Sequence, residues 1–206
     1  MKQKHFIDSH KCATGAFVLF CMWKFNAWEN TTAWIYLALH GTYGILWALK
    51  SALFGDKQWE QPTSLAYGLV IWGALSLYWS APFLITSRNL EAPPWLLALC
   101  VSVYTIGTFL HFAGDMQKHV NLSLRPGQLF LDGIWSFSRN PNYLGELFIY
   151  LGFTALAMHY FPVLALLAMV CAVWVPNMLR KERSLSRYPE FAEWKKKSGI
   201  IFPFFP

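Results

Sequence analysis

Long apolar stretches separated by short polar connections dominate the pattern of this chain. A helix that crosses a bilayer needs about 20 mostly apolar residues. Six stretches approach that length, at residues 12–28, 32–53, 64–86, 94–114, 142–159 and 161–178. The pattern therefore predicts an all-α integral membrane protein with about six transmembrane helices. The first stretch is short and contains Lys24, and the last two lie so close together that we expect a tight helical hairpin around residues 160–162.

Two polar segments interrupt this apolar pattern in the second half of the chain. The longer one covers residues 115–141 and is interpreted as a loop. The other is a tail at residues 180–197, followed by an apolar ending at residues 199–206. We expect this tail to be amphipathic. No linker separates the apolar stretches into groups, so the chain is interpreted as a single membrane domain, residues 1–206.

Composition agrees with a membrane protein and narrows the classes of function. Hydrophobic residues make up 55% of the chain and aromatic residues 18%, which is too apolar for an ordinary soluble domain of this size. The four cysteines lie in apolar runs without a C-x-x-C motif, so they are interpreted as reduced packing residues. We predict no metal site, and no glycine-rich nucleotide loop of the Rossmann or Walker type is present.

The net charge of +6 is explained by membrane topology. If six spans connect two cytoplasmic termini, every Lys and Arg except Lys24 and Arg88 falls on the cytoplasmic side. This distribution obeys the positive-inside rule. We therefore expect both polar segments to face the cytoplasm, and we expect contacts with membrane lipid and none with nucleic acid. The membrane would be that of the endoplasmic reticulum in a eukaryote and the inner membrane in a bacterium.

The densest polar run, residues 136–146, joins the long connection to the fifth apolar stretch. Pro141 stands where a helix would begin, and Asn140 can cap its first turn. A helix start offers free N–H groups to a phosphate, and Arg139 adds a full charge beside it. Asn142 and Glu146 are one turn apart, and an ionisable group inside an apolar span is usually functional. The structural alternative is a capped helix entry in which Glu146 pairs with a lysine or arginine.

The other polar residues allow both a functional and a structural interpretation. Asp115 can accept a hydrogen bond from a ribose hydroxyl or an amide, and Lys118 and Arg125 can hold phosphates. The alternative is a solvated loop with turns at residues 126–127 and 132–133. In the tail, Arg180, Arg183 and Arg187 follow helical spacing and could line one face. They could equally form a basic helix at the lipid headgroups.

Residues 139–146, with the order Arg-Asn-Pro-Asn-Tyr-Leu-Gly-Glu, resemble the signature of the steroid 5-alpha-reductase superfamily, which includes the sterol reductases. Upstream, the segments 115–118, 125–127 and 132–135 are similar to the loop of that superfamily. Downstream, the tyrosine-proline pair at Tyr188 and the apolar ending at residues 201–204 are similar to its terminus. The resemblance covers about the last hundred residues, so residues 115–206 form the most family-like half.

The resemblance implies an NADPH-dependent reductase that saturates a carbon-carbon double bond in a lipid-like substrate such as a steroid, sterol or other enone. The cofactor contacts that it implies here are Asp115, Arg125, Arg139, Asn142, Glu146, Glu182 and Tyr188. We add Lys118 as a phosphate contact and Tyr143 as part of the matched run. The resemblance also implies Tyr78 as the proton donor, with Glu60 as its carboxylate partner. His111 replaces an asparagine of the steroid enzymes, which argues against a steroid more than against the cofactor.

Two alternatives stay open. Isoprenylcysteine and phospholipid methyltransferases share the fold and bind S-adenosylmethionine through an Arg-His-Pro-x-Tyr-x-Gly signature. Pro141, Tyr143 and Gly145 fit that signature, whereas Asn140 replaces its histidine and Asn142 and Glu146 fit the reductases better. The third possibility is a membrane lipid-binding protein without catalytic activity.

Overall fold

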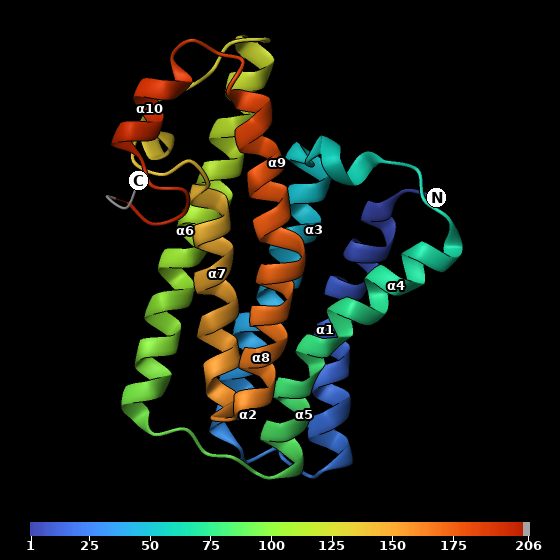
Figure 1. Ribbon diagram of the computed structural model, residues 1–206. Coiled ribbons are helices and arrows are strands. Elements are labelled where there is room, and N and C mark those ends of the chain that lie inside the picture. Colours follow the sequence, from blue (N-terminus) through green and yellow to red (C-terminus); the bar gives the residue numbers. More distant parts are fainter. Residues whose placement is uncertain (204–206) are drawn as a thin grey trace. The chain divides into compact units, whose positions relative to one another are not determined.

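The computed structural model describes residues 1–203, and helices make up most of that part of the chain (Figure 1). Within these residues there is no β-strand, and only isolated bridges join Lys2 to Pro62 and Ser138 to Gly199. The all-α prediction is therefore confirmed. Of the apolar ending that contributed to the family resemblance, residues 204–206 lie outside the described residues.

The helices and short helical turns follow one another with few breaks. In chain order they are α1 (Gln3–Lys24), α2 (Thr31–Tyr36), η1 (Leu37–Gly41), α3 (Thr42–Phe54), η2 (Lys57–Glu60), α4 (Leu65–Ser76), η3 (Leu77–Trp79), α5 (Ser80–Ser87), α6 (Pro94–Leu124), η4 (Gly133–Ser136), α7 (Pro141–Thr154), η5 (Ala155–Ala157), α8 (Tyr160–Met169), η6 (Val170–Trp174), α9 (Val175–Leu185) and α10 (Phe191–Lys197). The turns η1 and η6 are π-helical and the other η elements are 3-10 turns.

The chain forms two compact units, each built from two separate segments. Unit 1 comprises Met1–Tyr104 and Leu151–Leu166, whereas unit 2 comprises Thr105–Tyr150 and the chain from Leu167 onward. The boundaries fall within α6, α7 and α8, so these helices contribute to both units. The family-like half predicted from residue 115 onward differs from unit 2 because residues 151–166 belong to unit 1.

Unit 1 contains the N-terminal helices, and side-chain caps fix the starts of α2 and α4. Asn30 Oδ1 accepts from the backbone N–H of Ala33 at 2.7 Å, and Ser64 Oγ accepts from that of Tyr67 at 3.2 Å. Each cap satisfies one free N–H group at a helix start. The helix α3 lies so close to α1 at Gly44 that any Cβ there would collide with the backbone oxygen of Lys11.

Within residues 1–203, three helical stretches are long and apolar enough to cross a membrane, and all three match predicted spans. They are Leu65–Ser87, Pro94–Leu124 and Tyr160–Leu185. Helices also occupy the other three predicted spans, at α1, at α2 to α3 and at α7. That these three cross the membrane as well stays a prediction.

The polar connection at residues 115–141 is only partly a loop, so that prediction was wrong for its first third. The helix α6 continues to Leu124 and carries Asp115 and Lys118 on helical turns. No proline or glycine interrupts residues 115–124, and Pro126 then disfavours helical backbone in the residue before it. The polar residues therefore extend an apolar helix by about 15 Å.

Three smaller boundaries also differ from the prediction. The helix α1 begins at Gln3, nine residues before the first apolar stretch, because its first turns are polar but helical. The chain reverses before α8 at Met158, which has a left-handed φ of 46°, and not at Tyr160. Arg187 lies beyond the end of α9 at Leu185, so it does not share a helical face with Arg180 and Arg183.

Candidate functional site

The site in unit 2 is built on a close crossing of α6 and α7. A Cβ at Gly107 would lie 2.7 Å from the backbone oxygen of Gly145. A Cβ at Gly145 would collide in turn with the backbone nitrogen of His111. Glycine at both positions lets the two helices approach closely, as small residues do at membrane helix interfaces. The crossing places the family-like run of α7 against the polar extension of α6.

Three polar side chains meet beside this crossing. Asn142 donates through Nδ2 to Oδ1 of Asp115 at 3.0 Å, and His111 Nδ1 lies 3.1 Å from the backbone oxygen of Asn142. His111 Nε2 lies 3.8 Å from the other carboxylate oxygen of Asp115. His111 and Asp115 are buried. The structure therefore brings together two of the predicted cofactor contacts, Asp115 and Asn142, and adds His111 to them.

Asn142 carries a buried acceptor without a partner. Its Oδ1 atom is removed from solvent and makes no hydrogen bond, although its Nδ2 is bound to Asp115. A buried carbonyl oxygen without a donor costs free energy, and most such atoms in proteins are satisfied. The arrangement is suited to a bound molecule that brings an N–H or O–H group.

Arg139 has a different environment from the one predicted. The guanidinium is buried, and it donates through Nε to Oε1 of Glu182 and through Nη1 to the backbone oxygen of Ser198. Its backbone N–H donates to the oxygen of Gly199 at 2.9 Å. Two predicted cofactor contacts, Arg139 and Glu182, thus bind each other and fasten the C-terminal tail.

Lys181 belongs to the same hydrogen-bond network as Arg139, and this role was not identified from the sequence. Its ammonium donates to the backbone oxygen of Arg139 at 2.6 Å and to Oδ1 of Asn140 at 3.0 Å. It also lies 4.3 Å from the centre of the Trp135 ring. The Asn140 side chain, expected to cap α7, instead accepts from Lys181 and donates to the oxygen of Ile200 at 2.8 Å. A lysine among many basic tail residues gave no sequence signal for this role.

Three further predicted cofactor contacts, in or just after α6 and in the tail, lie nearer to solvent. Arg125 is exposed and its Nη1 lies 3.2 Å from Oδ2 of Asp132. Lys118 is half-buried and follows Asp115 by three residues on α6, which places it near the same helical face. Tyr188 is half-buried and its hydroxyl accepts from Arg187 Nη2 at 3.2 Å.

Tyr143 and Glu146 lie on α7 within the same unit. The ring of Tyr143 lies 5.7 Å from that of Trp174, centre to centre. Glu146 is half-buried, one turn beyond Asn142. Both are therefore held on the helix that carries the Asn142 cluster.

The two predicted catalytic residues, Tyr78 and Glu60, belong to unit 1 but do not come together. Glu60 binds Lys2, at 2.6 Å, and Lys4 at the start of α1. Tyr78 is buried beyond the far end of α4, whose 12 residues rise about 18 Å. Trp79, the neighbour of Tyr78, stacks on His10 and Phe17 further along α1. The structure therefore gives Tyr78 no Glu60 partner.

A buried polar pair in unit 1 was not expected from the sequence. Tyr36 Oη lies 2.7 Å from Nδ1 of His40, and His40 stacks on Phe153 at 4.0 Å between ring centres. His40 lies in the π-helical turn η1, and such turns often mark functional positions. Only the separation of four residues between Tyr36 and His40 could have suggested their contact.

Among the described residues, no group of three or more His, Cys, Asp or Glu side chains is placed to hold a metal ion. The chain is 27% identical over 164 residues to the cobalt-zinc-cadmium resistance protein CzcN of Cupriavidus metallidurans. That alignment covers 77% of this chain and 60% of CzcN, so the chain spans less than two thirds of this relative's length. No solved structure was found to match the chain.

Residues 56–198 match a family described as "Protein of unknown function (DUF1295)". The matched region includes the Asn142 cluster (Asn142 with Asp115 and His111) and the Arg139–Glu182 pair. It also includes the predicted cofactor contacts. The family is steroid 5-alpha-reductase-like, which agrees at this coarser level with the resemblance noted from residues 139–146. Since the match covers well over half of the chain, this protein belongs to the DUF1295 family.

Proposed function

We propose that this protein is a membrane reductase that uses NADPH to saturate a carbon-carbon double bond in a lipid-like substrate. The observation that carries the proposal is the unsatisfied buried Oδ1 of Asn142 beside the Asp115 carboxylate. The steroid 5-alpha-reductase-like character of the family supports the same reaction class.

The residues of this cluster fit the polar groups of NADPH. Asn142 Oδ1 can accept from the nicotinamide amide or from a ribose hydroxyl, and Asp115 can accept from a second hydroxyl. Lys118 is the phosphate contact that we retain, with Tyr143, Glu146 and Tyr188 as further contacts. Arg139 and Glu182 act indirectly in this proposal, because their charged groups are bound to each other and to the tail.

When bound, NADPH supplies the hydride in such a reaction. The chain must then position the acceptor, exclude water and supply a proton. We propose Tyr78 as the proton donor, because its hydroxyl can act as a general acid in a buried setting. Glu60 is left out of this role because it pairs with Lys2 and Lys4.

The alternative is a methyltransferase that uses S-adenosylmethionine. One observation favours it: the Arg139 guanidinium, expected to bind a phosphate, is buried against a carboxylate. S-adenosylmethionine has no phosphate, but it carries ribose hydroxyls and amine groups that Asp115 and Asn142 could also bind.

Ligand-induced thermal stabilisation of the protein in detergent tests these functions. A ligand at 100 times its dissociation constant should stabilise the native state by about 2.7 kcal/mol. We expect a higher melting temperature with NADPH and no shift with S-adenosylmethionine. A shift with S-adenosylmethionine alone would replace the reductase by the methyltransferase.

A folded protein that responds to neither ligand would indicate a lipid-binding protein without catalytic activity. The variant Glu146→Gln separates this case further. In the reductase it should weaken the response to NADPH while leaving the melting temperature without ligand nearly unchanged. In a non-catalytic protein it should leave function intact.

We also propose that six helices cross the membrane and that both termini face the cytoplasm. The three long apolar stretches and the distribution of Lys and Arg support this arrangement. Reporter proteins fused in turn to each terminus should both be active on the cytoplasmic side. Opposite locations of the two reporters would require an odd number of spans.

A further inference from the structure

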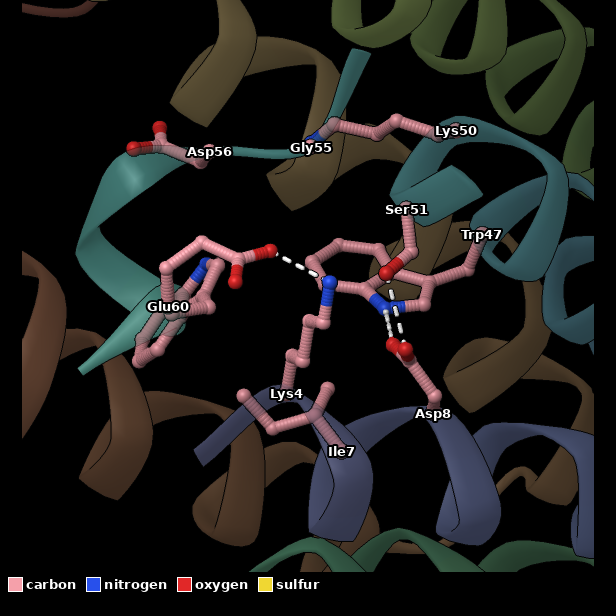
Figure 2. Close-up of a pocket in the computed structure, with 10 residues that line it drawn as sticks. Lys4, Ile7, Asp8, Trp47, Lys50, Ser51, Gly55, Asp56 and Glu60 are labelled. Atoms are coloured by element: carbon pink, nitrogen blue, oxygen red, sulfur yellow. Dashed lines mark hydrogen bonds and ion pairs between the residues drawn. The ribbon is translucent and has the colours of Figure 1, made fainter. Parts of the chain in front are cut away.

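A hollow in unit 1 lies where the start of α1 and the end of α3 meet the turn η2 (Figure 2). It is lined by Lys4, Ile7, Asp8, Trp47, Lys50, Ser51, Gly55, Asp56, Trp59 and Glu60. Seven of these ten residues precede residue 56, where the family match begins, and Asp56, Trp59 and Glu60 lie at its start. Most of the hollow therefore lies outside the region that defines the family.

Charges of both signs alternate around this hollow. Figure 2 shows Lys4 and Glu60 meeting on one side, with Asp8 against Trp47 and Ser51 on the other. Asp8 accepts from Trp47 Nε1 at 2.9 Å and from Ser51 Oγ at 2.7 Å, which fixes its carboxylate. Each carboxylate oxygen can accept a further hydrogen bond, and an ammonium has three donors. A molecule with one positive and one negative group can therefore bind both sides at once.

The Lys4–Glu60 pair can rearrange for a ligand at little cost. Glu60 is bound by both Lys2 and Lys4, and the three side chains remain partly exposed, at 35%, 49% and 27%. Exposed pairs of this kind contribute little to stability, because water screens the charges. The second lysine lets one ammonium bind an anion while the other stays with Glu60.

The surroundings of the hollow favour a lipid headgroup over a soluble molecule. Ile45, Leu49 and Leu53 are exposed and recur every four residues along α3, so they form one apolar strip on the opposite side of this helix from Trp47 and Ser51. Such a strip suits an acyl chain, and tryptophans such as Trp47 and Trp59 are typical of the membrane interface.

We propose that this hollow binds the phosphoethanolamine headgroup of a membrane phospholipid, with the phosphate at Lys4 and the ammonium at Glu60 and Asp8. The alternating charges match a zwitterion, and the carboxylates disfavour a headgroup with only negative charge. A primary ammonium is favoured over choline because it can donate hydrogen bonds to carboxylates. The Trp47 ring, which could attract choline, already has Lys11 and Lys50 ammonium groups within 4.1 and 4.6 Å of its centre.

Native mass spectrometry of the whole protein with lipids of identical acyl chains tests this inference. Phosphatidylethanolamine, phosphatidylcholine and phosphatidylglycerol are supplied in equal amounts. We expect the wild type to retain phosphatidylethanolamine about tenfold more than phosphatidylcholine, the ratio that one charge-assisted hydrogen bond supplies. Equal retention of these two lipids, or a preference for phosphatidylglycerol, would overturn the inference.

Variants separate the two halves of the headgroup. Glu60→Gln should bring the ratio of phosphatidylethanolamine to phosphatidylcholine toward one, and Asp8→Asn should do the same if the protein remains folded. Lys4→Gln should lower the retention of both lipids, because both carry the phosphate. Glu193→Gln, at an exposed carboxylate of unit 2 paired with Lys196, is the matched control and should keep the wild-type ratio.

A soluble headgroup distinguishes a lipid from a free metabolite. Phosphoethanolamine without acyl chains should raise the melting temperature of the protein much less than the lipid does. An equal shift with both would reject a lipid as the occupant. An unchanged lipid ratio in folded Glu60→Gln would reject the headgroup contact itself. Neither measurement uses NADPH, so the inference stands or fails independently of the proposed reductase.

Discussion

Arg139 donates through Nε to Oε1 of Glu182 in a pair whose side chains are only 3% and 13% exposed. The two residues are 43 positions apart, so the pair joins the start of α7 to α9. Hydrogen bonds from Arg139 to Ser198 then hold the end of α10. The family resemblance implies Arg139 and Glu182 as cofactor contacts. In the structure these two charged groups bind each other and hold the start of α7 against α9 and the end of α10.

We predict that Glu182→Gln destabilises the protein strongly. The substitution leaves the Arg139 cation buried without its carboxylate, and removal of one partner from a buried pair costs about 3–5 kcal/mol. Thermal or denaturant unfolding in detergent, without any nucleotide, measures the effect. Glu193→Gln is the control: its pair with Lys196 is 65% and 71% exposed, so we expect a loss of about 0–1 kcal/mol. Similar losses in both variants would contradict the structural role of the Arg139 pair.

We predict that Gly145→Ala also destabilises unit 2. The added Cβ would collide with the backbone of His111, so α6 and α7 would have to separate, and overpacking of this kind costs about 1–3 kcal/mol. The matched control is Gly73→Ala in α4, where nothing lies within 4 Å of the added Cβ. That change should be neutral or slightly stabilising, because alanine favours helix more than glycine does. A drop in melting temperature for Gly73→Ala of the same size would show that the close crossing is not the cause.

Nucleotide binding beside Asn142 should depend on the charge of Asp115. Asp115→Asn keeps the shape of the side chain but removes its charge, and a hydrogen bond to a charged group is worth about 1.5–3 kcal/mol. We therefore expect NADPH affinity to fall about 10- to 100-fold in a titration that follows fluorescence or heat. Glu193→Gln, at an exposed carboxylate paired with Lys196, should change the affinity by less than about fivefold. Equal effects of the two substitutions would remove Asp115 from the binding site.

The helical architecture could be predicted because apolar length is a local property of the sequence. The stretches around α4 to α5, α6 and α8 to α9 were found by that criterion, and their starts agree within one residue. The extension of α6 to Leu124 was missed because polarity was taken as a sign of a loop. Helix formation depends on the backbone, and only Pro126 and Gly127 provided the signal for its end.

The candidate site could be predicted in its residue types but not in its pairing. Asp115 and Asn142 were identified, and they do meet beside Gly145. The pairing of Arg139 with Glu182 and the position of Lys181 depend on how the tail folds back, and contacts over 40 residues leave no periodic pattern. The contacts of Glu60 also join residues far apart in the chain and leave no periodic pattern. Glu60 was therefore predicted as the partner of Tyr78, whereas Lys2 and Lys4 bind it.

We predict that the contribution of Glu60 to stability depends on pH. Hydrogen bonds from Lys2, which has the larger effect, and from Lys4 lower the pKa of the Glu60 carboxyl from its ordinary value of 4.5 to about 2. Since the pKa is lower in the folded state, the pair stabilises the protein above pH 4.5, and this contribution is lost as the pH falls toward about 2.

Glu60→Gln removes the titrating group. The difference in melting temperature between wild type and variant, measured in detergent without lipid, should therefore be constant from pH 7 to about pH 5 and shrink below that. In a protein that also carries Lys2→Gln, the melting-temperature difference caused by Glu60→Gln should be smaller, because one donor to Glu60 is lost. In a protein that also carries Glu193→Gln, this difference should equal that in the wild type. A difference that grows as the pH falls would show that Glu60 is not held as a carboxylate by these lysines.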